Sequence, residues 1–326
     1  MTGGTGFVGG HVVRALLKRG ETPRCLVRSE SPLGNLAGLG VEVARGDLSS
    51  VSALAQAMAG IPTAYHCAAD YRLYARNPQE VFAANVDGTR NLLRAAGEAG
   101  VRKVVYTSSV GALGHSQTDA PADETTPVSA SDMVGSYKQS KFHAERVAVE
   151  FAQGGLPVVI VNPSTPVGEL DLKPTPTGQM IVRFLKGKMP AYVATGLNLV
   201  DVRDVAEGHL LAAERGRIGA KYILGHKNMS LKEILDGLAR LTGLPSPRLR
   251  LPHVVPLAIG ALDTLRARLS GGTPEVPWDG VRMARKTMYF DAGRAVRELG
   301  FPQSSIEDAL GRAVVWFREK GYAPSG

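Results

Sequence analysis

The first half of the chain alternates short apolar runs with longer segments in which apolar residues recur every three or four positions. Runs such as PVVIV, at positions 157–161, are apolar throughout, as expected of parallel strands that are buried on both faces. The longer segments fit amphipathic helices that cover a sheet. The predicted strands lie at 24–27, 41–44, 64–67, 103–107 and 157–161, and the predicted helices at 9–18, 51–58, 78–99 and 135–153.

Strands that alternate with helices predict an α/β fold with a doubly wound parallel sheet of the Rossmann type. After position 162 the alternation loosens into a loop rich in Pro, Gly and Thr, a helix near 179–186, another strand–helix unit and a short strand at 221–224. The last hundred residues or so fit helices joined by proline-rich segments.

A glycine-rich segment stands directly before the first predicted helix. Its spacing, G-x-x-G-x-x-G, permits a tight turn and lets a pyrophosphate approach the backbone N–H groups at the helix N-terminus. We expect cofactor contacts from Gly3, Thr5, Gly6, Phe7, Val8 and Gly9. The pattern predicts a dinucleotide-binding domain at 1–168, completed by 196–225, and a smaller, mostly helical substrate-binding domain made of 169–195 and 226–326.

Such a loop normally follows a strand, but only Met1 and Thr2 precede the first glycine. In the strand order 3-2-1-4-5-6 the missing strand would be the central one, between 24–27 and 64–67. We therefore expect a truncated first strand with an unpaired gap beside its neighbours. Our hypothesis is that the natural protein begins about 5–10 residues upstream, roughly the length of a strand.

The residue after the second strand of such a fold reads the ribose of the cofactor. An acid there binds the 2′-hydroxyl of NAD, whereas an arginine accommodates the 2′-phosphate of NADP. Arg28 occupies this place and favours NADP; Glu30, two residues on, leaves NAD possible. Asp47 and Leu48 follow the next strand and are candidates for the adenine edge, although Asp47 could also cap the next helix.

Tyr137 and Lys141 lie four residues apart in a predicted helix and therefore on one face of it. A neighbouring ammonium favours the phenolate and lowers the pKa of a tyrosine, which suits proton transfer near neutral pH. Ser108 and Ser109 follow the preceding strand, where its carboxyl end reaches the ligand crevice of a doubly wound sheet. These residues form a candidate catalytic group.

Taken together, these motifs resemble the extended short-chain dehydrogenase/reductases. The glycine loop, GDL, HCAA, NVDGT, TSS, Y-x-x-x-K and NPSTPVG occur in that family's order over roughly two thirds of the chain. Segments such as AADYRLY, KPTPTG and MPAYVATGLNLVDVRDVAEGHLLAAERG resemble the hopanoid-associated sugar epimerase group, near the dihydroflavonol-4-reductase-like enzymes.

The resemblance implies roles for single residues. Tyr137 would be the general acid/base, Lys141 would lower its pKa and bind ribose, and Ser109 would polarise the substrate oxygen. Asn85 would be structural rather than chemical. The cofactor would also touch Ala68, Ala69, Pro163, Ser164 and Val167, and the substrate candidates are Tyr71, Arg72, Tyr74 and Thr165.

Two of these candidates have other interpretations. Tyr71 and Tyr74, three residues apart, could instead seat a helix.

Glu169-Leu170 stands where the group often has Pro-Arg, which places an anion near the substrate loop and argues against an acidic substrate.

The reaction can be narrowed from the same residues. Dehydratases of the family carry an Asp-Glu pair after the serine or threonine, whereas Val110-Gly111 follow Ser109 here. An epimerase retains NAD, and Arg28 argues for NADP. We therefore expect an NADP-dependent oxidoreductase that reduces a carbonyl or oxidises a hydroxyl. The alternatives are a nucleotide-sugar epimerase linked to hopanoid biosynthesis and a non-catalytic NADP-binding sensor.

Composition limits the partners. The net charge is +8, but Lys and Arg are scattered without interleaved aromatics, so we expect no nucleic-acid binding. Residues 248–271 have an apolar centre flanked by arginines; they fit either a packed helix or a segment that touches an anionic membrane. The sequence contains no run of 18 apolar residues and therefore predicts no transmembrane helix. We expect a cytoplasmic monomer or homodimer, with peripheral contact to the inner membrane as a further prediction.

Four remaining side chains receive structural roles. Cys25 and Cys67 lie in apolar strands without metal-ligand spacing and are predicted to be buried thiols; no metal site is expected. His66 is predicted to be a core residue, and Asp204 to cap a helix.

Overall fold

The computed structural model describes residues 1–116 and 120–324. Its helices are α1 (Phe7–Lys18), α2 (Val51–Met58), α3 (Pro78–Phe82), α4 (Gly88–Glu98), α5 (Gly135–Gln153), α6 (Pro176–Leu185), α7 (Val202–Arg215), α8 (Leu231–Thr242), α9 (Val254–Ser270), α10 (Trp278–Met283), α11 (Gly293–Leu299) and α12 (Ile306–Glu319). Its strands are β1 (Arg24–Val27), β2 (Glu42–Arg45), β3 (Thr63–His66), β4 (Lys103–Thr107), β5 (Val158–Pro163), β6 (Thr165–Val167), β7 (Ala191–Val193), β8 (Gly196–Asp201), β9 (Lys221–Leu224), β10 (Lys227–Ser230) and β11 (Leu249–Leu251).

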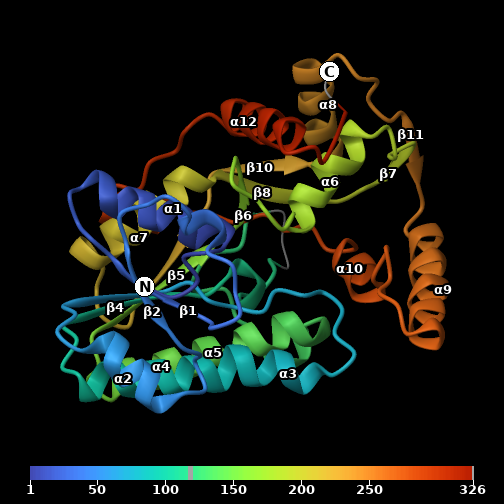
Figure 1. The fold of residues 1–326 in the computed structure, drawn as a ribbon. Helices are drawn as coiled ribbons and strands as arrows, with labels where there is room; N and C mark the ends of the chain where they lie inside the picture. Colours follow the sequence, from blue (N-terminus) through green and yellow to red (C-terminus); the bar gives the residue numbers. More distant parts are fainter. Residues whose placement is uncertain (117–119, 325–326) are drawn as a thin grey trace.

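The main sheet is parallel and doubly wound, which confirms the predicted fold class. β3, β4, β5 and β9 pair in that order, and β1 pairs with β2. One face is covered by α1 and α7, and the other by α2, α4 and α5 (Figure 1). Each face has its own apolar core, so the strands of the sheet are buried between two helical layers.

Met1 and Thr2 occupy the position of the expected central strand. Thr2 bridges Leu26 of β1 and His66 of β3, both in parallel. The N–H of Leu26 donates to the Met1 carbonyl (2.8 Å), and the N–H of Thr2 donates to the Tyr65 carbonyl (2.9 Å). The expected gap is therefore bridged at the carboxyl ends of its two neighbours, and the strand order is the one predicted.

The segment predicted as a single helix at 78–99 is divided in the structure. A π-helical turn, Ala83–Asp87, separates α3 from α4. Asn85 lies in this turn, and its side chain bonds to the backbone of Asp70 and to the hydroxyl of Ser140. These contacts hold the widened turn in place, which local helix propensity does not reveal.

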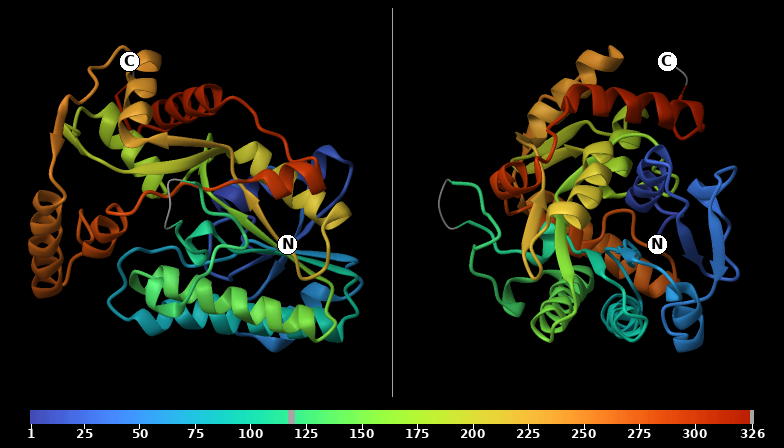
Figure 2. Two further views of the ribbon diagram at one scale, coloured as in Figure 1. Left: turned by 180° about the vertical axis from the view of Figure 1, so that it is seen from behind. Right: turned by 90° about the vertical axis from the view of Figure 1, so that its left-hand side faces the viewer.

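The helical part of the chain has a second core. Side chains of α6, α8 and α12 pack against the three-stranded sheet β10-β8-β6. α9 and α10 lie at one end of the molecule, beside this second core (Figures 1 and 2). No helix in the described part of the chain is long and apolar enough to cross a membrane.

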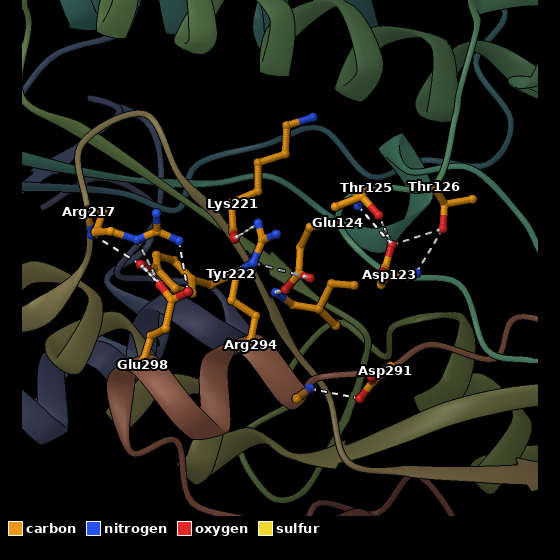
Figure 3. Close-up of polar contacts among 12 residues, drawn as sticks. Asp123, Glu124, Thr125, Thr126, Arg217, Lys221, Tyr222, Asp291, Arg294 and Glu298 are labelled. Carbon is orange, nitrogen blue, oxygen red and sulfur yellow. Dashed lines mark hydrogen bonds and ion pairs between the residues drawn. The ribbon is translucent and has the colours of Figure 1, made fainter.

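Polar contacts fasten α11 and segment 122–126 to the edge of the main sheet (Figure 3). The Glu124 carboxylate accepts from the Ile223 N–H (2.8 Å) and pairs with Arg294. Glu298 accepts from the Tyr222 hydroxyl (2.8 Å) and pairs with Arg217. α11 is therefore fixed beside β9.

One predicted cap is wrong. α7 begins at Val202, and the Asp201 carboxylate accepts from the Arg203 N–H, so Asp201 is the N-cap. Asp204 lies inside the helix, and its two oxygens accept from the N–H (2.6 Å) and hydroxyl (2.7 Å) of Ser304. Asp204 therefore joins α7 to the segment before α12.

Candidate functional site

The glycine loop has the geometry of a phosphate cradle. Gly3 has a φ of +74°, and a Cβ there would lie 2.6 Å from the Ala68 nitrogen. A Cβ on Gly9 would overlap the carbonyl oxygen of Gly3. α1 begins right after Gly6 with no side-chain cap and no acidic residue in its first turn. The free N–H groups and the positive end of α1 can therefore accept an anion at the predicted loop residues Thr5, Phe7 and Val8.

Two arginines lie where the strands next to this loop end. Arg28 follows β1 and is exposed. Arg45 ends β2, and its guanidinium donates to the carbonyls of Arg28 (3.2 Å) and Ser31 (3.1 Å). Arg45 is not among the residues predicted from the sequence, although it directly follows the strand predicted at 41–44 and stands two residues before Asp47.

Asp47 and Leu48 follow β2 as predicted. Asp47 does not cap α2: its carboxylate accepts from the Ser49 N–H (2.9 Å), and the cap is Ser50. The Leu48 carbonyl accepts from the Asn91 amide (3.0 Å), and its side chain lies against Gly88.

Ala68 and Ala69 follow β3, and Ala68 lies next to the glycine loop at Gly3. Asn85 holds the next residue, Asp70, by both its N–H (2.7 Å) and its carbonyl (2.9 Å). His66 is buried between Thr2 and Thr89, and burial lowers its pKa to about 3. It lies in the core, in agreement with the sequence.

The predicted catalytic residues come from β4 and α5. Ser109 lies just beyond β4, in an extended conformation, and its hydroxyl accepts from the Gly111 N–H (3.0 Å). Burial raises the pKa of Tyr137, and the neighbouring Ser109 side chain offsets this rise only in part. Ser109 and Tyr137 are thus neighbours, as a shared proton-transfer site requires.

The side chain of Lys141 lies at the end of β4. Its ammonium donates to the Thr107 carbonyl (2.7 Å) and lies over the ring of Tyr106. Burial lowers the pKa of Lys141 to about 8. Burial of the phenol raises the pKa of Tyr137, and Lys141 is not among the groups that shift it. The lysine is attached to the end of β4 instead.

The remaining predicted cofactor residues lie at the end of β5 and in β6. Pro163 ends β5, Thr165 and Val167 belong to β6, and Ser164 lies between the strands. The hydroxyl of Ser164 is buried and has no partner among residues 1–116 and 120–324. The uncapped N-terminus of α1 and the lack of room for a Cβ at Gly3 and Gly9 fit a bound dinucleotide.

Some of the predicted substrate residues already have partners within the protein. Arg72 pairs with Asp70 (2.6 Å) and Glu80 (3.4 Å), so its charge is already compensated. Tyr71 donates its hydroxyl to the Lys173 carbonyl (3.2 Å). Tyr71 and Tyr74 lie in an irregular segment between β3 and α3, so they do not seat a helix.

The loop after β6 is tied to the cofactor loop. The Asn35 amide donates to the carbonyls of Gly6 and Leu170 (2.9 Å each), and Leu170 has a positive φ of 69°. The Glu169 carboxylate pairs with Arg203 (2.7 Å) and Arg312 (3.1 Å). Glu169 is thus neutralised by ion pairs, and it no longer argues against an acidic substrate.

The chain is similar to known proteins over nearly its whole length. The model of the "NAD dependent epimerase/dehydratase family" matches residues 1–225. A "Putative dihydroflavonol 4-reductase" of Synechocystis is 49% identical over 99% of this chain and 95% of its own length. "Sterol demethylase protein B" of Methylococcus capsulatus is 38% identical over 98% of both chains.

Solved structures give the same fold. The crystal structure of gox2253 has a TM-score of 0.88 and 47% identity, covering 99% of this chain and 98% of its own. A nucleoside-diphosphate-sugar epimerase from Pseudomonas aeruginosa has a TM-score of 0.81 and 29% identity, covering 99% and 97%. The dTDP-glucose 4,6-dehydratase DesIV from Streptomyces venezuelae, solved with NAD, has a TM-score of 0.76 and 25% identity, covering 99% and 98%.

Proposed function

The chain belongs to the NAD dependent epimerase/dehydratase family, a family of nicotinamide-dependent enzymes, and from that premise we propose that it is an NADP-dependent carbonyl reductase. It would reduce a carbonyl, or oxidise the corresponding hydroxyl, with Ser109, Tyr137 and Lys141 as its catalytic residues. The name of its Synechocystis relative, a putative reductase, supports this class of reaction.

The two arginines beside the glycine loop are the observation that carries the proposal. Arg28 is exposed at the end of β1, and Arg45 is held against the segment after β1 by the carbonyls of Arg28 and Ser31. Two guanidinium groups suit a 2′-phosphate, which an adenosine ribose carries only in NADP. A reductase that takes up and releases its cofactor in each turnover is consistent with NADP.

The residues that would hold the cofactor fit it. The glycine loop and the N-terminus of α1 would take the pyrophosphate, the arginines the 2′-phosphate, and Lys141 the nicotinamide ribose. The bound cofactor supplies or accepts the hydride. Ala68, Ala69, Pro163, Ser164 and Val167 would line the remaining length of the dinucleotide.

The chain's own chemistry is proton transfer. The Ser109 hydroxyl would orient the substrate oxygen, and the Tyr137 phenol would donate a proton to it in the reducing direction. Because burial raises the pKa of Tyr137, the phenol keeps its proton at neutral pH and is suited to act as the acid. Tyr71, Tyr74 and Thr165 remain candidates for substrate contact, and Arg72 is a weaker one because it is already paired.

A nucleotide-sugar epimerase is the second candidate, and the name of the Pseudomonas aeruginosa structure favours it. That function would use retained NAD, with Glu30 on the ribose hydroxyls, and a link to hopanoid biosynthesis belongs to this alternative. A non-catalytic NADP-binding sensor is the third. For all three we propose the predicted domain division and a cytoplasmic monomer or homodimer. For the two enzymes we also propose a small-molecule substrate.

The test begins with the cofactor. The protein as purified is examined for bound nucleotide, and NADPH and NADH affinities are then measured by fluorescence titration for wild type and Arg28→Ala. We expect weaker NADPH binding by about ten-fold in the variant and unchanged NADH binding, since one charged contact is lost. Tightly bound NAD in the purified protein would overturn the reductase and favour the epimerase.

The reaction is tested by NADPH oxidation with a panel of aldehydes and ketones, comparing wild type, Tyr137→Phe and the control Tyr192→Phe. Tyr192 lies in β7 of the second core, so the control also loses one phenolic hydroxyl. Activity lost only in Tyr137→Phe supports the proposal, whereas equal activity of the two variants refutes the role of Tyr137. NADPH binding without turnover, and without epimerisation of nucleotide sugars, would support the sensor.

A further inference from the structure

Helix α9 has its large apolar side chains on the outside. The face toward the protein carries the small buried residues Gly260, Thr264 and Ala267. The opposite face carries a continuous apolar stripe at helical spacing: Val255 (38% exposed), Ile259 (50%), Leu262 (68%), Leu265 (54%) and Leu269 (82%). A helix that only packed against its own domain would show the reverse pattern, so this stripe needs a partner outside the described part of the chain.

The orientation of α9 is fixed by specific contacts with α10 and the segment before it. The Thr264 hydroxyl accepts from the Trp278 N–H (3.0 Å), and the Asp263 carboxylate accepts from the Val276 N–H (2.9 Å). A Cβ on Gly260 would lie 3.0 Å from the side chain of Val281, so the small inner face permits close packing. Rotating the stripe inward would break both hydrogen bonds.

The charges around the stripe indicate the nature of the partner. Arg248, Arg250, Arg266 and Arg268 lie in or next to α9, and they are exposed. Asp263 is the single acidic residue between positions 248 and 271, and it pairs with Arg266 (3.1 Å). A second copy docked on the same stripe would bring arginines against arginines, whereas anionic lipid headgroups would complement them.

We propose that α9 docks the protein on an anionic lipid membrane, lying parallel to the surface with the stripe in the headgroup region. Its 17 residues make a helix about 25 Å long, with one apolar face and basic flanks, which is the pattern of interfacial helices. The protein would be a peripheral membrane protein at this site, independently of the reaction that it catalyses.

The membrane-facing helix is attached to the predicted site. Leu73 lies against Gly280 of α10, and Arg76 lies against Gly271, at the end of α9. Asp279 of α10 contacts Gly135, where the helix that carries Tyr137 begins. Docking through α9 would therefore anchor the elements of the predicted substrate site at the bilayer surface.

The test is flotation of the full chain with vesicles of phosphatidylcholine alone or of phosphatidylcholine and phosphatidylglycerol in equal parts. We expect flotation with the anionic vesicles and its loss as the salt concentration rises to about 0.5 M. Leu262→Glu/Leu265→Glu should lower the partition coefficient by about a hundred-fold, because two large apolar contacts are lost. Arg266→Gln/Arg268→Gln should lower it by about five-fold per arginine.

The matched control is Ile218→Glu/Val315→Glu, which removes two other exposed apolar side chains (57% and 54% exposed) and adds the same charge. It should float like wild type, and all variants should bind NADPH alike. No flotation of the wild type overturns the proposal. So does a concentration-dependent dimer that only the Leu262→Glu/Leu265→Glu variant abolishes, since the stripe would then join two copies. Failure of the reductase assay leaves this test unaffected.

Discussion

Asp171 predicts an unusual dependence of stability on pH. Its side chain is almost completely buried, at 2% exposed, in the loop that follows β6. One carboxylate oxygen accepts from the N–H and hydroxyl of Thr175 (2.8 Å each), and the other has no partner among the described residues. Burial raises the pKa of Asp171 from 3.8 to about 6, and the two bonds from Thr175 oppose this only in part.

The sign follows from proton linkage. Between about pH 4 and pH 6 the folded protein holds a proton on Asp171 that the unfolded chain has lost, so Asp171 makes the free energy of unfolding fall as pH rises. A shift of about two pKa units corresponds to about 3 kcal/mol. The stabilising contribution is complete below pH 4 and lost as pH passes 6.

The perturbation is Asp171→Asn, which removes the titration and keeps an oxygen for Thr175. Other carboxylates also titrate in acid, so the quantity to compare is the unfolding free energy of the variant minus that of wild type. It should rise by about 3 kcal/mol from pH 3.5 to pH 7, measured by urea denaturation followed by circular dichroism. A pH-independent effect of the new amide on the free energy of unfolding is the same at both pH values and therefore cancels from this comparison.

Asp123→Asn is the matched control, with the opposite sign. Hydrogen bonds from Thr125 and Thr126 lower the pKa of Asp123, so its contribution is present at neutral pH and lost as pH falls. The variant-minus-wild-type difference should therefore decrease with pH for Asp123→Asn. If the difference in unfolding free energy between Asp171→Asn and wild type did not change with pH, the reasoning would be refuted. A buried carboxylate with only one oxygen hydrogen-bonded must keep its proton to a higher pH if burial disfavours its charge.

Three further predictions follow from single sites. Gly9→Ala should abolish NADPH binding in a fluorescence titration, because its Cβ would overlap the Gly3 oxygen. The control Gly311→Ala lies in open space on α12 and should raise the free energy of unfolding by about 0.5–1 kcal/mol in urea melts. Burial lowers the pKa of Lys141 to about 8, so between about pH 8 and pH 10 the folded protein has lost a proton that the unfolded chain still holds. The free energy of unfolding of wild type should therefore rise over this range in urea melts, and Lys141→Met should remove the rise. Asp204→Ala should cost about 1–3 kcal/mol in the same melts by leaving the Ser304 N–H without its acceptor, and Asp204→Asn should cost less.

The parts of the fold that local sequence determines were predictable. The strands at 24–27, 103–107 and 221–224 and the helices at 51–58 and 135–153 have the predicted bounds. Apolar runs, helix periodicity and glycine stops act within a few residues, and the order of such elements determines a doubly wound sheet. The same order brings the ends of β1, β3, β4 and β5 to one edge, where the candidate site residues were expected.

What could not be predicted depends on contacts between distant segments. The division of the 78–99 helix rests on Asn85 meeting Asp70 and Ser140, and the cap of α7 was assigned to Asp204 because its bonds to Ser304 were invisible. Glu169 was interpreted from its neighbours in sequence, but its partners are 34 and 143 residues away. Burial of Tyr137 likewise depends on the whole fold, so the direction of its pKa shift was beyond reach.

The predicted proton-transfer pair is positioned by neutral side chains behind it. The Asn162 amide donates to the carbonyl of Ser109 (3.1 Å) and to Glu145 (2.6 Å), which ties the end of β4 to β5 and α5. On the other side, the Ser140 hydroxyl donates to the Tyr137 carbonyl (2.8 Å) and accepts from Asn85 (2.8 Å). Asn162 therefore holds the backbone of Ser109 directly, and Asn85 holds that of Tyr137 through Ser140. Both amides fix the positions of the pair without titrating themselves. Asn85 was predicted only from the family resemblance, and Asn162 was not predicted. An amide side chain that hydrogen-bonds to the backbone produces no pattern of charge or spacing in the sequence.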